Sequence, residues 1–278
     1  MNYIQYMNAI GAKADEGSRF EHFRNLVVDV IAEELSSYIL ETHHKKGNEY
    51  LRLIGKGAHT MDMRSFFDGC RTSLDNFRSS PIFRLLRGEG ESSKFLFYVQ
   101  CVFSLSRLKS TDKEKVACRI EEAAMESSFP MAILRDRLDY FIVPSATPEI
   151  ERIAFEPTLA WLNAYPEAKI PLLRVLRDRV DASKERHVLD DLRLSLELLL
   201  KYILKNHKSL EKQNDPLGSY LKQQGCSTEI NNMFRELLNY FGKYQNEHVK
   251  HNEDINSSEV DFLVILCISF MRLLAQYA

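Results

Sequence analysis

The sequence of 278 residues contains only 11 glycines, and none of them forms a recognised nucleotide-binding or catalytic motif. The segment GEGESSK at 88–94 lacks the spacing of a phosphate-binding P-loop, and no strand pattern precedes it. The sequence also has no G-x-S-x-G and no H-E-x-x-H, the motifs of serine hydrolases and zinc proteases. It therefore carries no motif of these three classes.

Cysteine is scarce as well, and its spacing predicts neither a disulfide framework nor a metal site. The five cysteines form no C-x-x-C pair. An odd number of thiols, most of them inside apolar runs, is typical of reduced and buried side chains. We therefore predict no metal and no cofactor.

Long apolar runs are missing. The longest, FLVILCISFM at 262–271, is far shorter than the roughly 20 residues of a membrane-spanning helix. The N-terminal segment has no basic region followed by a long apolar core, so we expect no signal peptide. The net charge of -2 gives no global positive field, and RNA contact would need a local basic patch. We expect a cytoplasmic protein without membrane contact.

What the sequence does contain is helical periodicity. Apolar residues make up 45% of the chain and charged residues 27%, which is typical of a globular protein. No hairpin pattern of alternating residues around a glycine turn occurs, so we predict an all-α fold. Further helices are expected at 60–78, 94–108, 112–127 and 129–141. The first long helix is predicted from a stripe formed by Phe20, Phe23, Val27, Val30, Ile31 and Leu35.

Five of the eight prolines lie between residues 144 and 171, and they suggest the domain organisation. Each proline removes a backbone donor and disfavours helix at the preceding residue. We predict an N-terminal helical domain of unknown role at 1–143 and a proline-rich connector at 144–170, with a short helix at 158–165. A second helical domain would occupy 171–278.

The second domain shows the clearest helices. Leu189, Leu192, Leu196 and Leu199 recur at helical spacing. Ser227 is expected to cap a following helix whose apolar stripe continues to His248 and His251. Ser258-x-x-Asp261 matches a capping box at the start of the last helix.

The order of these segments resembles the HEPN superfamily, and most closely its abortive-infection C-terminal branch. The resemblance covers 171–278 and rests on LRLSLELLLKYIL at 192–204, a short helical segment, YQNEHVKHNE at 244–253 and an apolar closing helix. It implies a helical bundle that dimerises across its motif, and a metal-independent ribonuclease activity in active members. His251 matches the motif histidine, Asn246 the polar residue and Glu197 a common acidic position, but Gln245 replaces the motif arginine.

The replacement of the arginine matters for the chemistry. RNA cleavage without a metal requires proton transfer, which His251 can provide, and neutralisation of charge on the phosphate. Gln245 brings no charge, and Lys243 or Lys250 would supply only a point charge in place of an arginine fork. Losing a preorganised charge of this kind costs about 3 kcal/mol, or about a hundredfold in rate.

Other readings of the same residues stay open. A histidine in the last turn of a helix also interacts favourably with the helix dipole, and His248 with His251 could form half of a metal site. Arg174 and Arg177 lie one turn apart and could grip phosphate, although a mixed-charge exposed face is the simpler interpretation.

Two hypotheses about function follow. In the first, the chain is a component of a bacterial anti-phage defence system, and its degenerate HEPN-like domain is a protein-interaction or regulatory module. In the second, it is a ribonuclease toxin in which His251 is the acid or base, Asn246 orients the phosphate or the histidine, and Lys250 supplies charge. The expected partners are a second copy of the chain, a protein of the defence complex or RNA.

Overall fold

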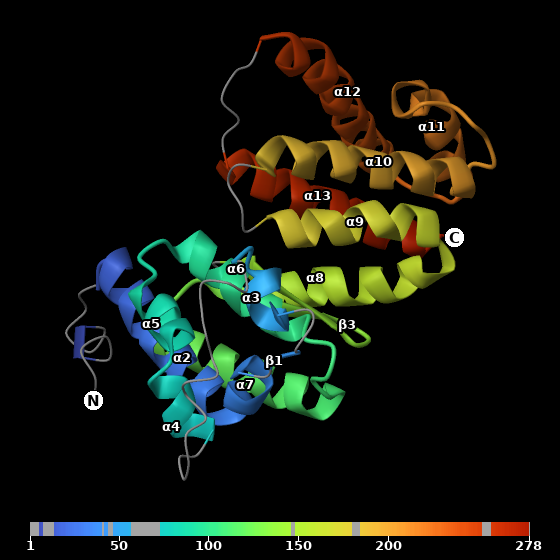
Figure 1. Ribbon diagram of the computed structural model, residues 1–278. Helices are drawn as coiled ribbons and strands as arrows, with labels where there is room; N and C mark the ends of the chain where they lie inside the picture. The colour runs from blue at the N-terminus through green and yellow to red at the C-terminus, as the bar shows by residue number, and fades with distance from the viewer. Residues whose placement is uncertain are drawn as a thin grey trace. The chain divides into compact units, whose positions relative to one another are not determined.

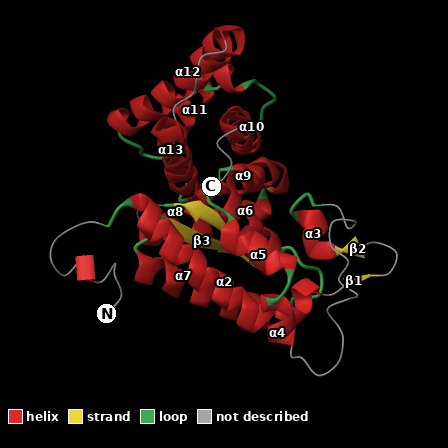
Figure 2. Cartoon of the chain, turned by 60° about the vertical axis from the view of Figure 1, so that its left-hand side comes forward, coloured by secondary structure: helices red, strands yellow, loops and turns green. Residues whose placement is uncertain are grey.

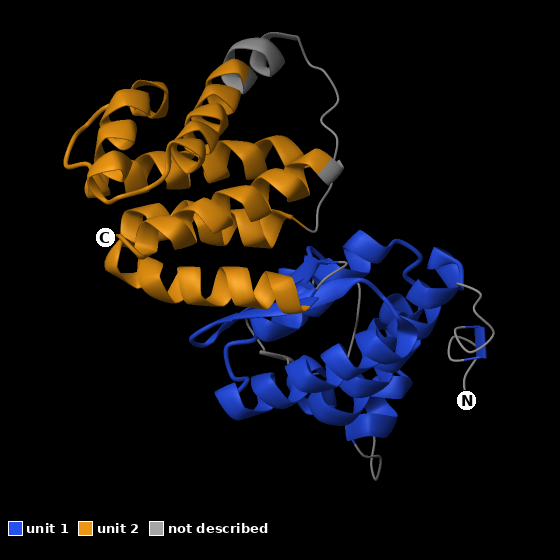
Figure 3. Ribbon diagram, turned by 180° about the vertical axis from the view of Figure 1, so that it is seen from behind, with its two compact units in different colours: residues 1–148 blue, residues 149–278 orange. Residues whose placement is uncertain are grey.

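The protein is described by a computed structural model that covers residues 6–7, 14–40, 42–43, 47–56, 73–145, 148–179, 184–251 and 257–277. The description includes the backbone but not the side chains of 42–43, 47, 244–251 and 257–258. The chain forms two compact units, Met1–Pro148 and Glu149–Ala278 (Figure 3). The described part contains twelve α-helices and two short hairpins, so the prediction of a predominantly all-α fold is confirmed.

The first unit is built around the long helix α2, Glu16–Leu40 (Figure 1). The whole predicted stripe from Phe20 to Leu35 is buried in this helix, and α7 packs along it. Phe23 stacks on Phe129 with ring centroids 4.5 Å apart. The elements of this unit are α2 (Glu16–Leu40), β1 (Thr42–His43), β2 (Gly47–Asn48), α3 (Glu49–Leu53), α4 (Ser73–Arg78), α5 (Pro81–Gly88), α6 (Ser92–Phe103), α7 (Ser110–Ser127), β3 (Met131–Asp136) and β4 (Asp139–Pro144).

The prediction of a helix at 129–141 is wrong, because this segment forms part of the β3–β4 hairpin. The strands pair antiparallel with Ile133 opposite Ile142, and the turn places Arg137 at a φ of 58°. Both faces of the hairpin are largely buried, so each strand carries a run of four apolar residues, 131–134 and 140–143, without the alternation that marks a half-exposed strand. Its turn also lacks the glycine or asparagine that usually takes a positive φ.

The hairpin is held by Gln100 of α6, which replaces a neighbouring strand at the edge of β4. The N–H of Ile142 donates to Gln100 Oε1, and Gln100 Nε2 donates to the carbonyl of Tyr140, both at 2.7 Å. Figure 2 shows the two yellow strands of the hairpin among the helices of this unit, where β4 packs on α6 and β3 on α7. One side chain therefore satisfies both a donor and an acceptor of an otherwise open strand edge.

The second unit is entirely helical in its described part, and none of the helices described in the chain is both long enough and apolar enough to cross a membrane. α10 lies against α9 and α13, and Leu189, Leu192, Leu196 and Leu199 are all buried as predicted. Ser227 accepts the N–H of Ile230 at 3.3 Å, which confirms the predicted cap. The elements are α8 (Pro148–Trp161), η3 (Leu162–Ala164), α9 (Pro166–Asp178), α10 (Glu185–Ile203), η5 (Leu210–Lys212), α11 (Asn214–Gln223), α12 (Thr228–His251) and α13 (Ser257–Ala275).

The segment predicted as a proline-rich connector is mostly helical, because three of its four prolines are accommodated within helices, while Pro144 ends β4. Pro148 and Pro166 stand in first turns, where a missing N–H costs nothing. Pro157 lies inside α8 and leaves the carbonyl of Ile153 without its helical donor. Arg272 of α13 donates to this carbonyl instead. The proline therefore creates an acceptor that joins α8 to α13.

We predict that Gln100→Leu destabilises the first unit by about 2 kcal/mol, since leucine leaves a buried N–H and carbonyl unpaired. Urea unfolding followed by circular dichroism would measure the loss. Amide exchange over residues 139–144 should accelerate at the same time. Gln223→Leu, at an exposed position of α11, is the matched control and should change neither quantity. Unchanged exchange in Gln100→Leu would contradict the role given to this side chain.

Candidate functional site

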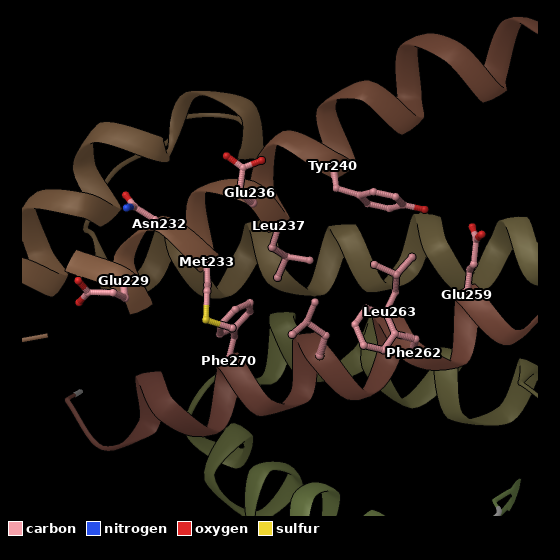
Figure 4. A pocket seen from close by; sticks show the side chains of 11 residues that line it. Glu229, Asn232, Met233, Glu236, Leu237, Tyr240, Glu259, Phe262, Leu263 and Phe270 are labelled. Atoms are coloured by element: carbon pink, nitrogen blue, oxygen red, sulfur yellow. The ribbon is translucent and has the colours of Figure 1, made fainter. Parts of the chain in front are cut away.

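A groove of about 650 Å³ lies between α12 and α13 of the second unit (Figure 4). The two helices run antiparallel, since Phe234 meets Phe270 with ring centroids 4.0 Å apart while Tyr240 lies near Glu259 at the other end. The groove is lined by Glu229, Asn232, Met233, Glu236, Leu237, Tyr240, Glu259, Phe262, Leu263, Leu266 and Phe270.

The groove arises because both helices carry apolar side chains over a wide arc. Phe234, Leu238 and Phe241 are buried on the core side of α12. Met233 precedes Phe234 and Leu237 precedes Leu238 by one position, and Figure 4 shows both projecting from α12 toward α13. An apolar arc this wide exceeds what one packing partner covers.

Exposure differs between the floor and the walls of the groove. Leu237, Leu263 and Phe270 are buried and form its floor. Met233 is 50% exposed and Phe262 63% exposed. Met233 lies toward the Phe270 end of the groove and Phe262 toward the Glu259 end (Figure 4). Large apolar side chains that stay exposed within one concavity are typical of an interaction site.

Three of the five polar residues that line the groove are glutamates. Glu229 and Glu259 lie at opposite ends, and Glu236 lies on the α12 side (Figure 4). No lysine, arginine or histidine is among the lining residues, and none of the three carboxylates forms a salt bridge within the described part of the chain. Burial raises the pKa of Tyr240, and the Glu259 carboxylate raises that pKa further. The groove is therefore apolar inside and anionic at its rim.

The residues predicted for catalysis lie further along α12. The backbone is helical through His251, which places Gln245, Asn246, Lys250 and His251 in the last turns of this helix. Their side chains are outside the described residues, as are those of His248 and Ser258 and the whole of Asn252. Their chemical role stays a prediction.

The residues predicted to bind phosphate have partners of their own. Arg174 donates from Nε and Nη2 to the two carboxylate oxygens of Asp191, at 2.9 and 2.5 Å. Arg177 also has an interaction partner. Lys243 is exposed on α12. Binding of phosphate by Arg174 would therefore first require breaking its pair with Asp191.

Glu197, which matches the acidic position of the resemblance, has a supporting role in this structure. Its carboxylate accepts hydrogen bonds from Lys201 Nζ at 2.6 Å and from the N–H of Leu210 at 3.2 Å. Arg193 lies 3.4 Å from the same carboxylate and also pairs with Glu211. Arg193, one turn before Glu197 on α10, is thus engaged by two glutamates.

Thiols and metals give no alternative site within the described residues. Cys101 and Cys267 are buried as predicted, whereas Cys118 is exposed on α7. Burial raises the pKa of Cys101 to about 12, which makes its thiolate inaccessible at neutral pH. No group of three or more metal-ligating side chains occurs among the described residues.

Comparison with protein-family models, with curated proteins and with solved structures gave no match for this chain. The groove was not foreseen from the sequence, because its lining residues were assigned to core stripes. One signal was present: FLVILCISFM at 262–271 leaves almost no polar face, so a helix made of it must be covered on every side or remain partly exposed.

We predict that Glu259→Gln lowers the pKa of Tyr240, because it removes a negative charge that disfavours the phenolate. The pKa stays above its ordinary value, since burial still raises it. The stability linked to this shift is present below the unfolded pKa near 10 and is lost as the pH rises through the folded pKa. A titration of the tyrosine ring carbon by NMR measures the change. Glu229→Gln, at the opposite end of the groove, should leave this pKa unaltered.

Proposed function

We propose that the chain is a protein-interaction or regulatory component, and that it docks a partner protein in the groove between α12 and α13. The observation that carries this proposal is the exposed apolar lining of a preformed groove on two otherwise packed helices. From the resemblance to HEPN proteins we also propose that the chain acts in a bacterial anti-phage system of the abortive-infection type.

The exposed apolar side chains of the groove support binding of a specific partner. Fully burying a Phe or Met side chain contributes about 1.5–3 kcal/mol, and Phe262 and Met233 both retain half or more of their exposure. Large apolar side chains that fill a concave surface are the usual anchors of protein interfaces. The buried floor keeps its shape without a ligand, which lowers the ordering cost of binding.

The charges of the second unit also favour docking of a partner protein. A ribonuclease needs positive charge at the phosphate, whereas the groove rim is anionic, and Arg174 and Arg193 of the same unit are paired with carboxylates. Gln245 adds no charge at the motif position. These features favour docking of a protein over binding of RNA in this unit.

The ribonuclease hypothesis has one supporting observation of its own. α12 remains helical through His251, and the resemblance expects the motif at the end of such a helix. We therefore keep cleavage of RNA, with His251 as the acid or base, as the second candidate function.

The docking proposal predicts site-specific crosslinking in the native cell. A photo-crosslinking phenylalanine analogue at position 262 should give a discrete adduct with one partner protein. The same analogue at position 170, where Ile170 is an exposed aliphatic residue of α9, should give none. Adding Leu266→Trp, which fills the groove with an indole, should remove the adduct at 262. Equal crosslinking at both positions would contradict the proposal.

The two candidate functions differ in what happens when the chain is expressed alone. We predict equal growth and intact RNA for the wild-type chain and for His251→Ala, because the motif lacks its arginine. Growth curves and a denaturing gel of total RNA measure this. If only the wild type arrests growth with discrete RNA fragments, and His207→Ala at an exposed site still does so, the ribonuclease function replaces the docking function.

A further inference from the structure

We propose that the partner segment is an amphipathic α-helix of about three turns, with apolar anchors on one face and lysines or arginines flanking them. This inference rests on the proposed docking function and names the chemistry of its partner. It combines two independent features of the groove, its length and the sign of its charge.

The length follows from α12. The lining residues run from Glu229 to Tyr240, and at 1.5 Å per residue this stretch is about 16 Å long. Three turns of helix have the same length and present anchors at positions i, i+3 or i+4, and i+7 to one side. Two antiparallel helices with a continuous apolar floor form the kind of channel that receives such a face.

The charge selects among helices. Glu229 and Glu259 stand at the two ends and Glu236 stands between them on the α12 side (Figure 4). A helix lying in the groove would place the side chains beside its anchors close to these carboxylates. Basic residues there gain attraction, and acidic residues meet like charge. Long basic side chains can also cover the apolar walls with their methylene stems.

The same charge disfavours the other occupants. A second copy of the chain, docked symmetrically through this groove, would bring two sets of the same three glutamates together. An anionic lipid or a fatty acid would place its headgroup near carboxylates that have no cationic partner among the described residues. A basic amphipathic helix satisfies both the apolar floor and the rim.

The test uses the full-length chain and designed helical peptides of about 15 residues. Two peptides share leucine anchors and differ only in carrying lysine or glutamate at the flanking positions. Fluorescence anisotropy measures their affinities. From three exposed charge pairs we expect the lysine peptide to bind about tenfold more tightly at low salt, and this ratio should shrink as salt is added. Leu266→Trp should weaken both peptides.

Charge reversal gives the decisive comparison. The combined variant Glu229→Lys, Glu236→Lys and Glu259→Lys should prefer the glutamate peptide. The matched control, Glu149→Lys, Glu167→Lys and Asp190→Lys, changes the net charge equally at exposed positions of the same unit and should keep the lysine preference. Both sets include two glutamates in the first turn of a helix, so their effects on helix dipoles are alike.

The possible outcomes distinguish a failure of the basic-helix proposal from a failure of the docking function. Equal binding of the two peptides, sensitive to Leu266→Trp, overturns the basic helix and leaves groove docking intact. Absence of binding by either peptide, together with a crosslink at position 262, overturns the helix and retains a partner of another shape. Binding that Leu266→Trp does not weaken overturns both proposals, because the peptide then lies elsewhere.

Discussion

The carboxylate of Glu197 fixes the position of α12, and the groove depends on it. Glu197 binds the N–H of Leu210 and so holds η5 against α10, with Lys201 and Arg193 balancing its charge. α12 rests on η5, and the approach is close: a Cβ at Gly242 would lie 3.4 Å from Glu211 Cγ. Because η5 supports α12 from the core side, the opposite apolar face of α12 is left for the groove.

α13 is held by a different set of interactions, and this separation keeps the groove open. Arg179, whose side chain is 1% exposed, pairs with Glu151 of α8 and with Asp261 of α13. Breaking such a buried pair costs about 3–5 kcal/mol, because it leaves an uncompensated charge. Arg272 adds a second link to α8 through the carbonyl that Pro157 leaves open. Each wall of the groove is thus anchored on its far side, so the two walls do not need to close on each other to be stable.

The sequence predicted helices and their buried stripes well, and it failed where burial is two-sided. The α2 and α10 stripes and the Ser227 cap follow from 3.6-residue periodicity and local hydrogen bonding, which act within one segment. The β3–β4 hairpin was missed because both of its faces are buried and Arg137 replaces the usual glycine. The groove was missed for a related reason: in a helix that is apolar all round, periodicity does not distinguish a face that meets the core from one that meets solvent.

The two candidate functions share one helix. Tyr240 closes the groove, and His251 lies eleven residues beyond it on α12, about 16 Å along the same axis. Binding in the groove and the proposed chemistry at the helix end would therefore occupy different parts of α12, and the proposed chemistry would still need the positive charge that Gln245 lacks. Arg174 and Arg193 each pair with a carboxylate, so moving either arginine to His251 would leave that carboxylate unpaired. A positive charge supplied from outside the unit would avoid this cost in free energy.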